Sequence, residues 1–241
     1  MTPIVGQPVR VALVGMGRMG RALEALAPER GCEIVARLDT VEMARGLSAA
    51  DLREAEVAIE FTTPASALTN TAALLALGCP VVVGTTGWNH DLPVLEAAVR
   101  RHGGRALWSP NFSVGVQLFL AIVEDAARRA REVAGFDVHI VETHHAAKMD
   151  APSGTAMAIG ERVEDGLGRT VPVSSIRVGS VPGTHEVLLD AAFEQISLRH
   201  EARDRRVFAD GALTAARWLA APRPPALYTM RDVLAPMPSL P

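Results

Sequence analysis

The chain has 241 residues, of which 49% are hydrophobic and 21% charged, and its formal net charge is −3. This length allows one large domain or two modest ones, and the small negative charge argues against broad non-specific binding of nucleic acid. Two cysteines, Cys32 and Cys79, give no disulfide framework, and we find neither a signal-peptide pattern nor an apolar stretch long enough to span a bilayer. We therefore expect a soluble, cytoplasmic protein that binds no membrane and no nucleic acid.

The first half alternates between short β-branched runs and segments with helical spacing. The predicted strands are Val9–Val14, Glu33–Leu38, Val57–Phe61, Val81–Val83 and Ala106–Trp108. The predicted helices between them are Arg18–Ala27, Pro64–Leu77 and Leu92–Arg101. Apolar strands separated by helices indicate a doubly wound, Rossmann-type α/β domain with a parallel sheet, whose ligand crevice lies beyond the carboxyl ends of the strands.

After Ser113 the pattern changes to that of an α+β domain with an open mixed or antiparallel sheet. Helices are predicted at Val114–Val133 and around Thr155–Asp165. Strands are predicted at Asp137–Thr143, Ser175–Val181, His185–Ala191 and Gln195–His200. The closing segments, Ala209–Leu219 and Tyr228–Leu234, are predicted to be helical and to return to the first domain.

A glycine-rich turn follows the first strand. In VALVGMGRMGRAL, Gly15, Gly17 and Gly20 have GxGxxG spacing at the start of a helix, which allows a tight turn, close approach of a pyrophosphate and close helix–strand packing. Asp39 ends the second strand, where an acid accepts hydrogen bonds from an adenosine ribose. We predict a dinucleotide site, although a merely structural turn or the adenosylmethionine site of a methyltransferase fits the same residues.

Two further loops follow predicted strands. GTTG at 84–87 and SPNFS at 109–113 supply small residues that allow a ligand to approach the backbone, and they also fit ordinary loops. We expect them at the same sheet edge as the glycine turn.

The segment ETHHAAKMDAPSGTA, residues 142–156, combines His144 and His145 with Lys148, the only lysine among 24 basic residues. An ammonium group can lose its proton when it is buried, whereas a guanidinium cannot, so this lysine marks a position where arginine fails. The sequence Ser153-Gly154-Thr155 (SGT) opens a helix and is suited to hold an anion.

Other interpretations of this segment stay open. The lysine can persist by chance, and the histidines can simply cap the end of a strand. A metal site is also conceivable, but no third ligand stands at a recognised spacing, and we expect no metal.

These motifs resemble the 4-hydroxy-tetrahydrodipicolinate reductase family, also called dihydrodipicolinate reductase. The resemblance covers essentially the whole chain. The matching segments are GMGRMGR, EFTTP, VVVGTTGW, SPNFSVGV, ETHHAAKMDAPSGTA, RRVFADGALTAARWL and YTMRDVL. The resemblance implies that residues 1–113 and 206–241 bind NADH or NADPH, and that residues 114–205 bind a dicarboxylate substrate and form a homotetramer through their sheet.

The resemblance also implies roles for individual residues. His144 is the catalytic acid/base and Lys148 the proton donor beside it. The implied substrate contacts are His145, Ser153, Gly154 and Thr155. The implied cofactor contacts are Gly15, Gly17, Arg18, Met19, Gly20, Asp39, Phe61, Thr62, Gly84, Thr85, Thr86, Ser109, Pro110, Asn111 and Phe112, with Arg205 and Phe208 closing the cleft from the far side.

The choice of cofactor depends on the residue after the acid. Members that use NADPH carry a basic residue there, whereas this chain has Thr40. Asp39 without a cation repels a 2′-phosphate, so we expect NADH to be preferred or used equally, unless Arg37 or Arg45 reaches the phosphate.

The implied reaction is hydride transfer to ring carbon four of a cyclic imine-type acid, or of its dehydrated form, followed by protonation from the His–Lys pair. Two other functions are considered. A semialdehyde dehydrogenase needs a nucleophilic thiol, which neither Cys32 nor Cys79 offers in an active-site loop. A non-catalytic dinucleotide sensor leaves the His–Lys–SGT segment without a purpose.

Overall fold

The computed structural model describes residues 6–133 and 135–235. These residues form two compact units with separate hydrophobic cores. One unit comprises the chain up to Ser113 together with the segment from Phe208 onward, and the other is Val114–Val207. Among the described residues, no helix combines the length and apolar character that a membrane crossing requires.

The first unit is built on a six-stranded sheet in the order β10-β5-β4-β3-β1-β2, in which all neighbouring strands are parallel. The strands are β1 (Val9–Val14), β2 (Cys32–Leu38), β3 (Val57–Glu60), β4 (Val81–Val83), β5 (Arg105–Trp108) and β10 (Ala226–Tyr228). In the sheet, β2 lies on one side of β1 and β3 lies on the other, so the order of the strands reverses after β2. This reversal of strand order puts a crevice beyond the carboxyl end of β1, where ligands of such sheets bind.

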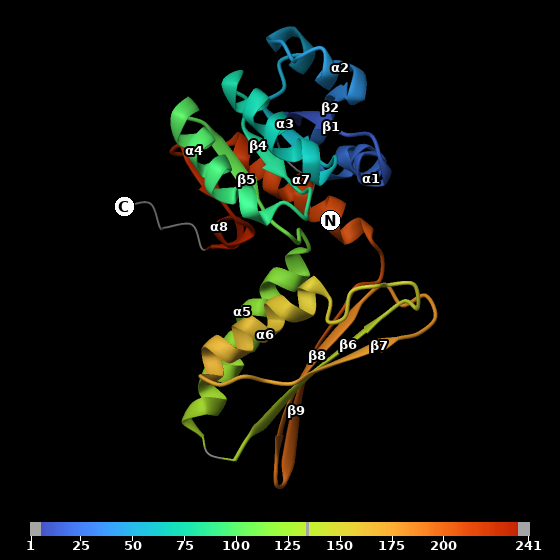
Figure 1. The fold of residues 1–241 in the computed structure, drawn as a ribbon, viewed down its shortest axis with the longest axis vertical. Coiled ribbons are helices and arrows are strands. Elements are labelled where there is room, and N and C mark those ends of the chain that lie inside the picture. The colour runs from blue at the N-terminus through green and yellow to red at the C-terminus, as the bar shows by residue number, and fades with distance from the viewer. Residues whose placement is uncertain (1–5, 134, 236–241) are drawn as a thin grey trace. The chain divides into compact units, whose positions relative to one another are not determined.

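Helices cover both faces of this sheet (Figure 1). They are α1 (Arg18–Leu26), α2 (Thr40–Ala44), α3 (Pro64–Ala76), α4 (Leu92–His102), α7 (Arg206–Ala220) and α8 (Met230–Leu234), with short 3-10 turns at Ala27–Arg30, Ala49–Leu52 and Asn89–Asp91. Side chains that alternate along a strand, such as Ala12 and Leu13 on β1 or Ala58 and Ile59 on β3, are equally buried. Burial on both faces explains why these strands read as continuous apolar runs.

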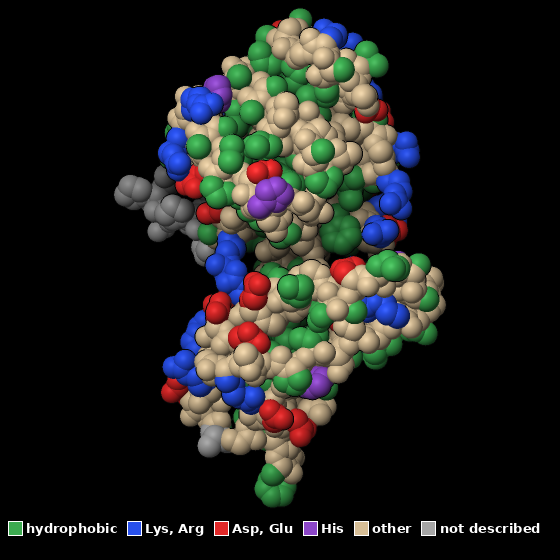
Figure 2. Space-filling model, viewed as in Figure 1, with side chains coloured by type: hydrophobic (Ala, Val, Ile, Leu, Met, Phe, Trp, Pro, Cys, Tyr) green, Lys and Arg blue, Asp and Glu red, His purple; other side chains and the backbone are tan. Residues whose placement is uncertain are grey.

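The second unit has a four-stranded mixed sheet in the order β7-β6-β8-β9. Its strands are β6 (Asp137–His144), β7 (Val173–Arg177), β8 (Thr184–Ala191) and β9 (Glu194–Glu201). Helices α5 (Val114–Glu132) and α6 (Gly154–Leu167) pack together and cover one face, with Ile140 and Val187 in the core between helices and sheet. In the described part of this unit no helix covers the other face, and Figure 2 shows hydrophobic side chains at the tip of the β8–β9 hairpin, where Phe193 is fully exposed.

The expected fold class is confirmed, and the differences are local. Ala226–Tyr228 forms the edge strand β10, whereas Tyr228–Leu234 was predicted to be helical throughout, because three residues at an edge are too few for a strand pattern. Strand β7 is Val173–Arg177, whereas Ser175–Val181 was predicted. The strand begins earlier because its pairing with β6 starts at Pro172, whose carbonyl accepts from Ile140 N–H. The chain turns at Gly179, whose φ is +51°.

Candidate active site

The glycine turn of the first unit has the shape that a dinucleotide requires. Gly15 has φ +93°, and a Cβ there would lie 2.2 Å from the carbonyl oxygen of Phe61. A Cβ on Gly20 would lie 2.2 Å from the carbonyl oxygen of Gly15, so two of the three glycines are needed for packing. A Cβ on Gly17 would meet no described atom within 4 Å. Gly17 therefore faces open space, as the glycine closest to a pyrophosphate should.

The start of α1 adds an electrostatic reason for anion binding. Gly17 is the N-cap, and in the described structure no side chain accepts from the first N–H groups of the helix. Arg18 and Met19 occupy the first turn, so their backbone N–H groups are oriented toward the crevice end of the helix. The residues present thus fit a bound dinucleotide.

The neighbouring loops after β3 and β4 are joined by hydrogen bonds. Thr62 N–H donates to Thr85 Oγ1 at 2.8 Å, and Thr62 Oγ1 donates to Glu60 Oε1. Glu60 is completely buried, which raises the pKa of its carboxyl, although hydrogen bonds from Thr62, Thr85 and Asn70 act in the opposite direction. The buried acid was not singled out from the sequence, and it fixes the two loops relative to each other.

An aromatic contact joins the loops after β3 and β5. The ring of Phe61 lies so close to Gly84 that a Cβ there would be 2.0 Å from Phe61 Cζ, and its centroid is 6.0 Å from that of Phe112 in an edge-to-face arrangement. Ser109 Oγ donates to the carbonyl of Asn111 at 2.7 Å and shapes the turn that contains Pro110. All predicted cofactor residues from Gly15 to Phe112 thus follow the carboxyl ends of parallel strands, at one edge of one sheet.

Asp39 lies at the end of β2, where it caps α2 by accepting from Thr40 N–H at 2.9 Å. The two nearby arginines are already paired with acids. Arg37 Nη2 lies 2.5 Å from Glu24 Oε1, and Arg45 forms an ion pair with Asp51.

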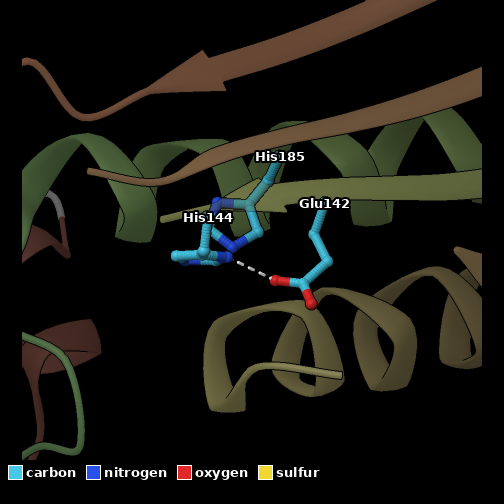
Figure 3. A group of neighbouring side chains, drawn as sticks. All are labelled: Glu142, His144 and His185. Atoms are coloured by element: carbon cyan, nitrogen blue, oxygen red, sulfur yellow. Dashed lines mark ion pairs between the residues drawn. The ribbon is translucent and has the colours of Figure 1, made fainter. Parts of the chain in front are cut away.

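In the second unit the predicted catalytic histidine is held by a buried carboxylate. His144 and Glu142 lie two residues apart on β6, so both side chains point to the helix-covered face of the sheet. Glu142 Oε2 is 2.6 Å from His144 Nδ1 (Figure 3). The two atoms are in direct contact, and the contact is an ion pair when the imidazole is protonated. His145 directly follows β6 and is half-buried.

Glu142 stays ionised because donors surround its carboxylate. It is completely buried, which raises the pKa, but hydrogen bonds from Ser175, Arg177 and Ser153 and the neighbouring His144 lower the pKa to about 2. Arg177 Nη2 donates to Oε1 at 2.7 Å and Ser153 N–H donates to the same oxygen at 3.2 Å.

A second buried histidine packs edge-to-face against the first. The ring centroid of His185, from β8, lies 5.2 Å from that of His144 (Figure 3). Burial lowers the pKa of His185 to about 4, and the positive charges of neighbouring groups act in the same direction. The pKa of His144 is also lowered, chiefly by burial and partly by Lys148 and Arg177, whereas Glu142 opposes this shift.

Lys148 is held beside this pair and is not free in solvent. Its Nζ lies 2.7 and 2.9 Å from the two carboxylate oxygens of Asp150, and the side chain is 22% exposed. Arg177 Nη2 donates to the backbone carbonyl of Asp150 at 2.6 Å, so it links the lysine loop to Glu142.

The predicted anion site begins α6. Ser153 is the N-cap, and its Oγ accepts from Ala156 N–H at 3.1 Å. A Cβ on Gly154 would meet no described atom within 4 Å, so the backbone is accessible there. Thr155 follows in the first turn of the helix.

The structure brings the predicted residues of each unit together, with two exceptions. Arg205 is an exposed residue before α7, in the second unit, and Phe208 lies within α7, in the first. Their predicted closure of the cofactor cleft stays a prediction.

Sequence reasoning missed Glu142, Arg177 and His185. The alternation of β6 places Glu142 on the same face as His144 and could have identified it. Arg177 and His185 come from strands paired through long-range contacts, and their local sequence carries no such signal.

Glu142, His144 and His185 together have the composition of a metal site. Ligand atoms of Glu142, His144 and His185 lie within 4.8 Å of one another, so the fold supplies the third ligand that sequence spacing did not. However, ligands of a tetrahedral zinc ion are about 3.3 Å apart, given Zn–N bonds of about 2.0 Å. The 2.6 Å between Glu142 and His144 is therefore a direct contact. The arginine on the same carboxylate also opposes a cation, so these residues do not fit a metal as arranged.

Comparisons with known proteins agree over the whole chain. Models of the N-terminus and C-terminus of dihydrodipicolinate reductase match residues 9–112 and 115–234. A 4-hydroxy-tetrahydrodipicolinate reductase of Thiobacillus denitrificans is 36% identical, with 94% of this chain and 98% of that protein covered. One of Alkalilimnicola ehrlichii is 38% identical, with 93% and 98% covered.

A solved structure has the same fold. The dipicolinate-bound dihydrodipicolinate reductase from Paenisporosarcina sp. TG-14 superposes with a TM-score of 0.75 at 22% identity, over 94% of this chain and 99% of that chain. With both family models matched and full-length relatives above 30% identity, the chain belongs to the dihydrodipicolinate reductase family.

Proposed function

We propose that the chain reduces 4-hydroxy-tetrahydrodipicolinate to tetrahydrodipicolinate with NADH or NADPH and a proton, with loss of the 4-hydroxyl group as water, a step of diaminopimelate and lysine biosynthesis. The observation that carries this proposal is the structure of segment 142–156 in this chain, which belongs to the family. There a buried imidazole, a held ammonium group and a helix start with the exposed Gly154 lie within one strand–loop–helix unit.

His144 acts as the acid that protonates the reduced ring, with Lys148 beside it. Burial, Lys148 and Arg177 lower the pKa of the imidazole, so it releases a proton readily, while Glu142 keeps the protonated form accessible. Asp150 holds the ammonium group of Lys148 in a defined position. A side chain that supplies a proton must have such a fixed geometry.

The dicarboxylate substrate is held by the start of α6. Gly154 and Thr155 supply backbone N–H groups at the helix N-terminus, Ser153, whose own N–H donates to Glu142, contributes its hydroxyl group, and His145 adds a half-buried side chain. An anion at this place is stabilised by the partial positive charge of the 14-residue helix.

A bound reduced nicotinamide supplies the hydride. The residues after β1, β3, β4 and β5 hold the dinucleotide mainly through backbone groups, and Asp39 receives the adenosine ribose. NADH is preferred or used equally with NADPH, because Asp39 repels a 2′-phosphate while Arg37 and Arg45 are engaged with Glu24 and Asp51. Residues 1–113 and 206–241 form the cofactor domain, and residues 114–205 form the substrate domain.

The open face of the second sheet is the surface through which four chains assemble. Val141 on β6, Leu188 on β8 and Ile176 on β7 lie on this face, and Ile176 is 47% exposed. A homotetramer would cover these side chains; sedimentation analysis of the purified chain tests this, and a monomer would contradict it. We also place the protein in the cytoplasm, as expected of an enzyme with two reduced cysteines.

Chemistry that depends on a thiolate lacks support. Cys32 and Cys79 are both buried, and burial raises their pKa values to about 11 and about 12. These thiols stay protonated and inaccessible, unlike the nucleophile of a semialdehyde dehydrogenase.

A direct assay tests the proposed function. Freshly generated 4-hydroxy-tetrahydrodipicolinate is added to the enzyme with NADH or NADPH, and loss of the reduced cofactor is recorded. We expect substrate-dependent oxidation with both cofactors. Cofactor binding without oxidation would favour a non-catalytic dinucleotide sensor and contradict the proposal.

A further inference from the structure

Glu142 is a fully buried, ionised carboxylate that the proposed reaction does not use directly. We infer that Glu142 is a positioning residue: together with Arg177 it fixes the ring of His144 in the form whose Nε2 exchanges the proton, and it ties that ring to the loop of Lys148. The inference rests on the proposed role of His144.

The distance between Glu142 and His144 determines which ring nitrogen carries the proton. A carboxylate oxygen 2.6 Å from Nδ1 is attractive only if Nδ1 bears a hydrogen, because two lone pairs at that distance repel each other. The neutral ring is therefore protonated on Nδ1. The proton that His144 gains or loses is the one on Nε2.

No side chain at position 183 covers Nε2, because residue 183 is glycine. Gly183 has φ +154°, and a Cβ on it would lie 3.0 Å from His144 Nε2. Glycine at this position thus keeps the proton-exchanging nitrogen from direct contact with a methyl group. Glu142 and Gly183 act on opposite ends of the same ring.

Arg177 extends this arrangement to the lysine. Its Nη2 donates both to Glu142 Oε1, at 2.7 Å, and to the carbonyl of Asp150, at 2.6 Å. The carboxylate of Asp150 in turn holds Lys148 Nζ. A continuous series of contacts therefore runs from His144 through Glu142, Arg177 and Asp150 to Lys148, and it sets the positions of both proton-handling groups.

The charges around His144 determine how its titration responds to Glu142. The facing groups are Glu142 on β6, Lys148 and Asp150 in the following loop, Arg177 on β7, and His185 on β8 with His200 of β9 behind it. Glu142 is the carboxylate in contact with the ring, and it opposes the lowering of the His144 pKa by burial and by the cations. Without its charge, the protonated imidazole becomes less stable.

The test compares Glu142→Gln with His144→Gln and with Glu161→Gln, a control on the exposed side of α6. For each full-length variant, kcat is measured across the pH range at saturating NADH and substrate, and NADH affinity is measured separately. We expect Glu142→Gln to lower kcat at least about tenfold, to move the alkaline fall of kcat to lower pH, and to leave NADH affinity unchanged.

A kcat and a pH profile of Glu142→Gln that match Glu161→Gln would overturn the inference, and so would an alkaline limb displaced to higher pH. If His144→Gln itself retains full activity, the proposed role of His144 fails, and the positioning role fails with it. If His144→Gln is impaired while Glu142→Gln is normal, only the positioning role is overturned.

A measurement on the unmodified chain covers the case in which Glu142→Gln does not fold. The ¹⁵N signals of labelled histidine are recorded, and those of His144 are assigned by their loss in His144→Gln. A neutral ring protonated on Nδ1 supports the inference. A neutral ring protonated on Nε2 overturns it.

Discussion

The two candidate binding regions of this chain are formed by different kinds of chemical groups. The edge of the first sheet is formed by glycines, hydroxyl groups and backbone N–H groups, with the fully buried acid Glu60 holding two loops together. The site of the second unit is formed by a buried carboxylate, two imidazoles packed edge to face, an arginine and an ammonium group. We therefore expect dinucleotide binding by the first region to depend little on pH, whereas the chemistry of the second depends on which groups carry protons.

This contrast predicts the largest effect at Lys148. Both Lys148→Ala and Lys148→Arg should lower kcat by about two orders of magnitude or more, because a guanidinium keeps the charge but cannot give up a proton. NADH affinity should change little, since all predicted cofactor residues except Arg205 lie in the other unit. Arg129→Ala, which removes an exposed cation from α5, serves as the control. Near-normal turnover of Lys148→Arg would show that only the charge matters.

The buried imidazole of His185 predicts pH-dependent stability. Its pKa is lowered, chiefly by burial, from 6.5 to about 4, so in this window the unfolded chain binds a proton that the folded chain does not. The free energy of unfolding should therefore fall as the pH drops from 6.5 toward 4, with this residue contributing on the order of 2–3 kcal/mol. Urea unfolding of the parent and of His185→Gln across this window measures the effect. An equally steep decline in both proteins would contradict the assignment to His185.

Substitution by alanine should have different effects at two glycines of the first unit, although it adds the same methyl group at both. Gly20→Ala places a Cβ against the carbonyl of Gly15, so it should lower the thermal midpoint and weaken NADH binding about tenfold or more. Gly17→Ala meets open space, so it should leave the thermal midpoint almost unchanged and still weaken NADH binding. Calorimetry of unfolding and of NADH binding separates the two. Unchanged NADH binding by Gly17→Ala would mean that no pyrophosphate approaches there.

The smallest effect is expected for the choice of cofactor. The ratio of kcat/KM for NADH to that for NADPH should exceed one, and Thr40→Arg should reduce it by up to about fivefold, because an exposed ion pair contributes at most about 1 kcal/mol. A strong preference of the parent for NADPH would contradict the role given to Asp39.

The sequence pattern predicted the strands of the sheet where both of their faces are buried. Strands such as β1 and β4 are buried on both faces, and their apolar runs were predicted with the observed bounds. Edge strand β10 has only three residues and gave no such pattern.

The site was predicted in part. His144, Lys148 and the start of α6 lie within one short segment, which made their proximity predictable. Arg177 and His185 reach the same place through the pairing of β7 and β8 with β6, and sequence spacing carries no trace of that pairing.

The most direct test of the central claim is a paired measurement on His144→Gln: kcat with freshly generated substrate and the dissociation constant for NADH. The account predicts that kcat falls by about two orders of magnitude or more while NADH affinity stays within about twofold of the parent. Undiminished turnover, or a loss of activity explained entirely by weaker NADH binding, would contradict it.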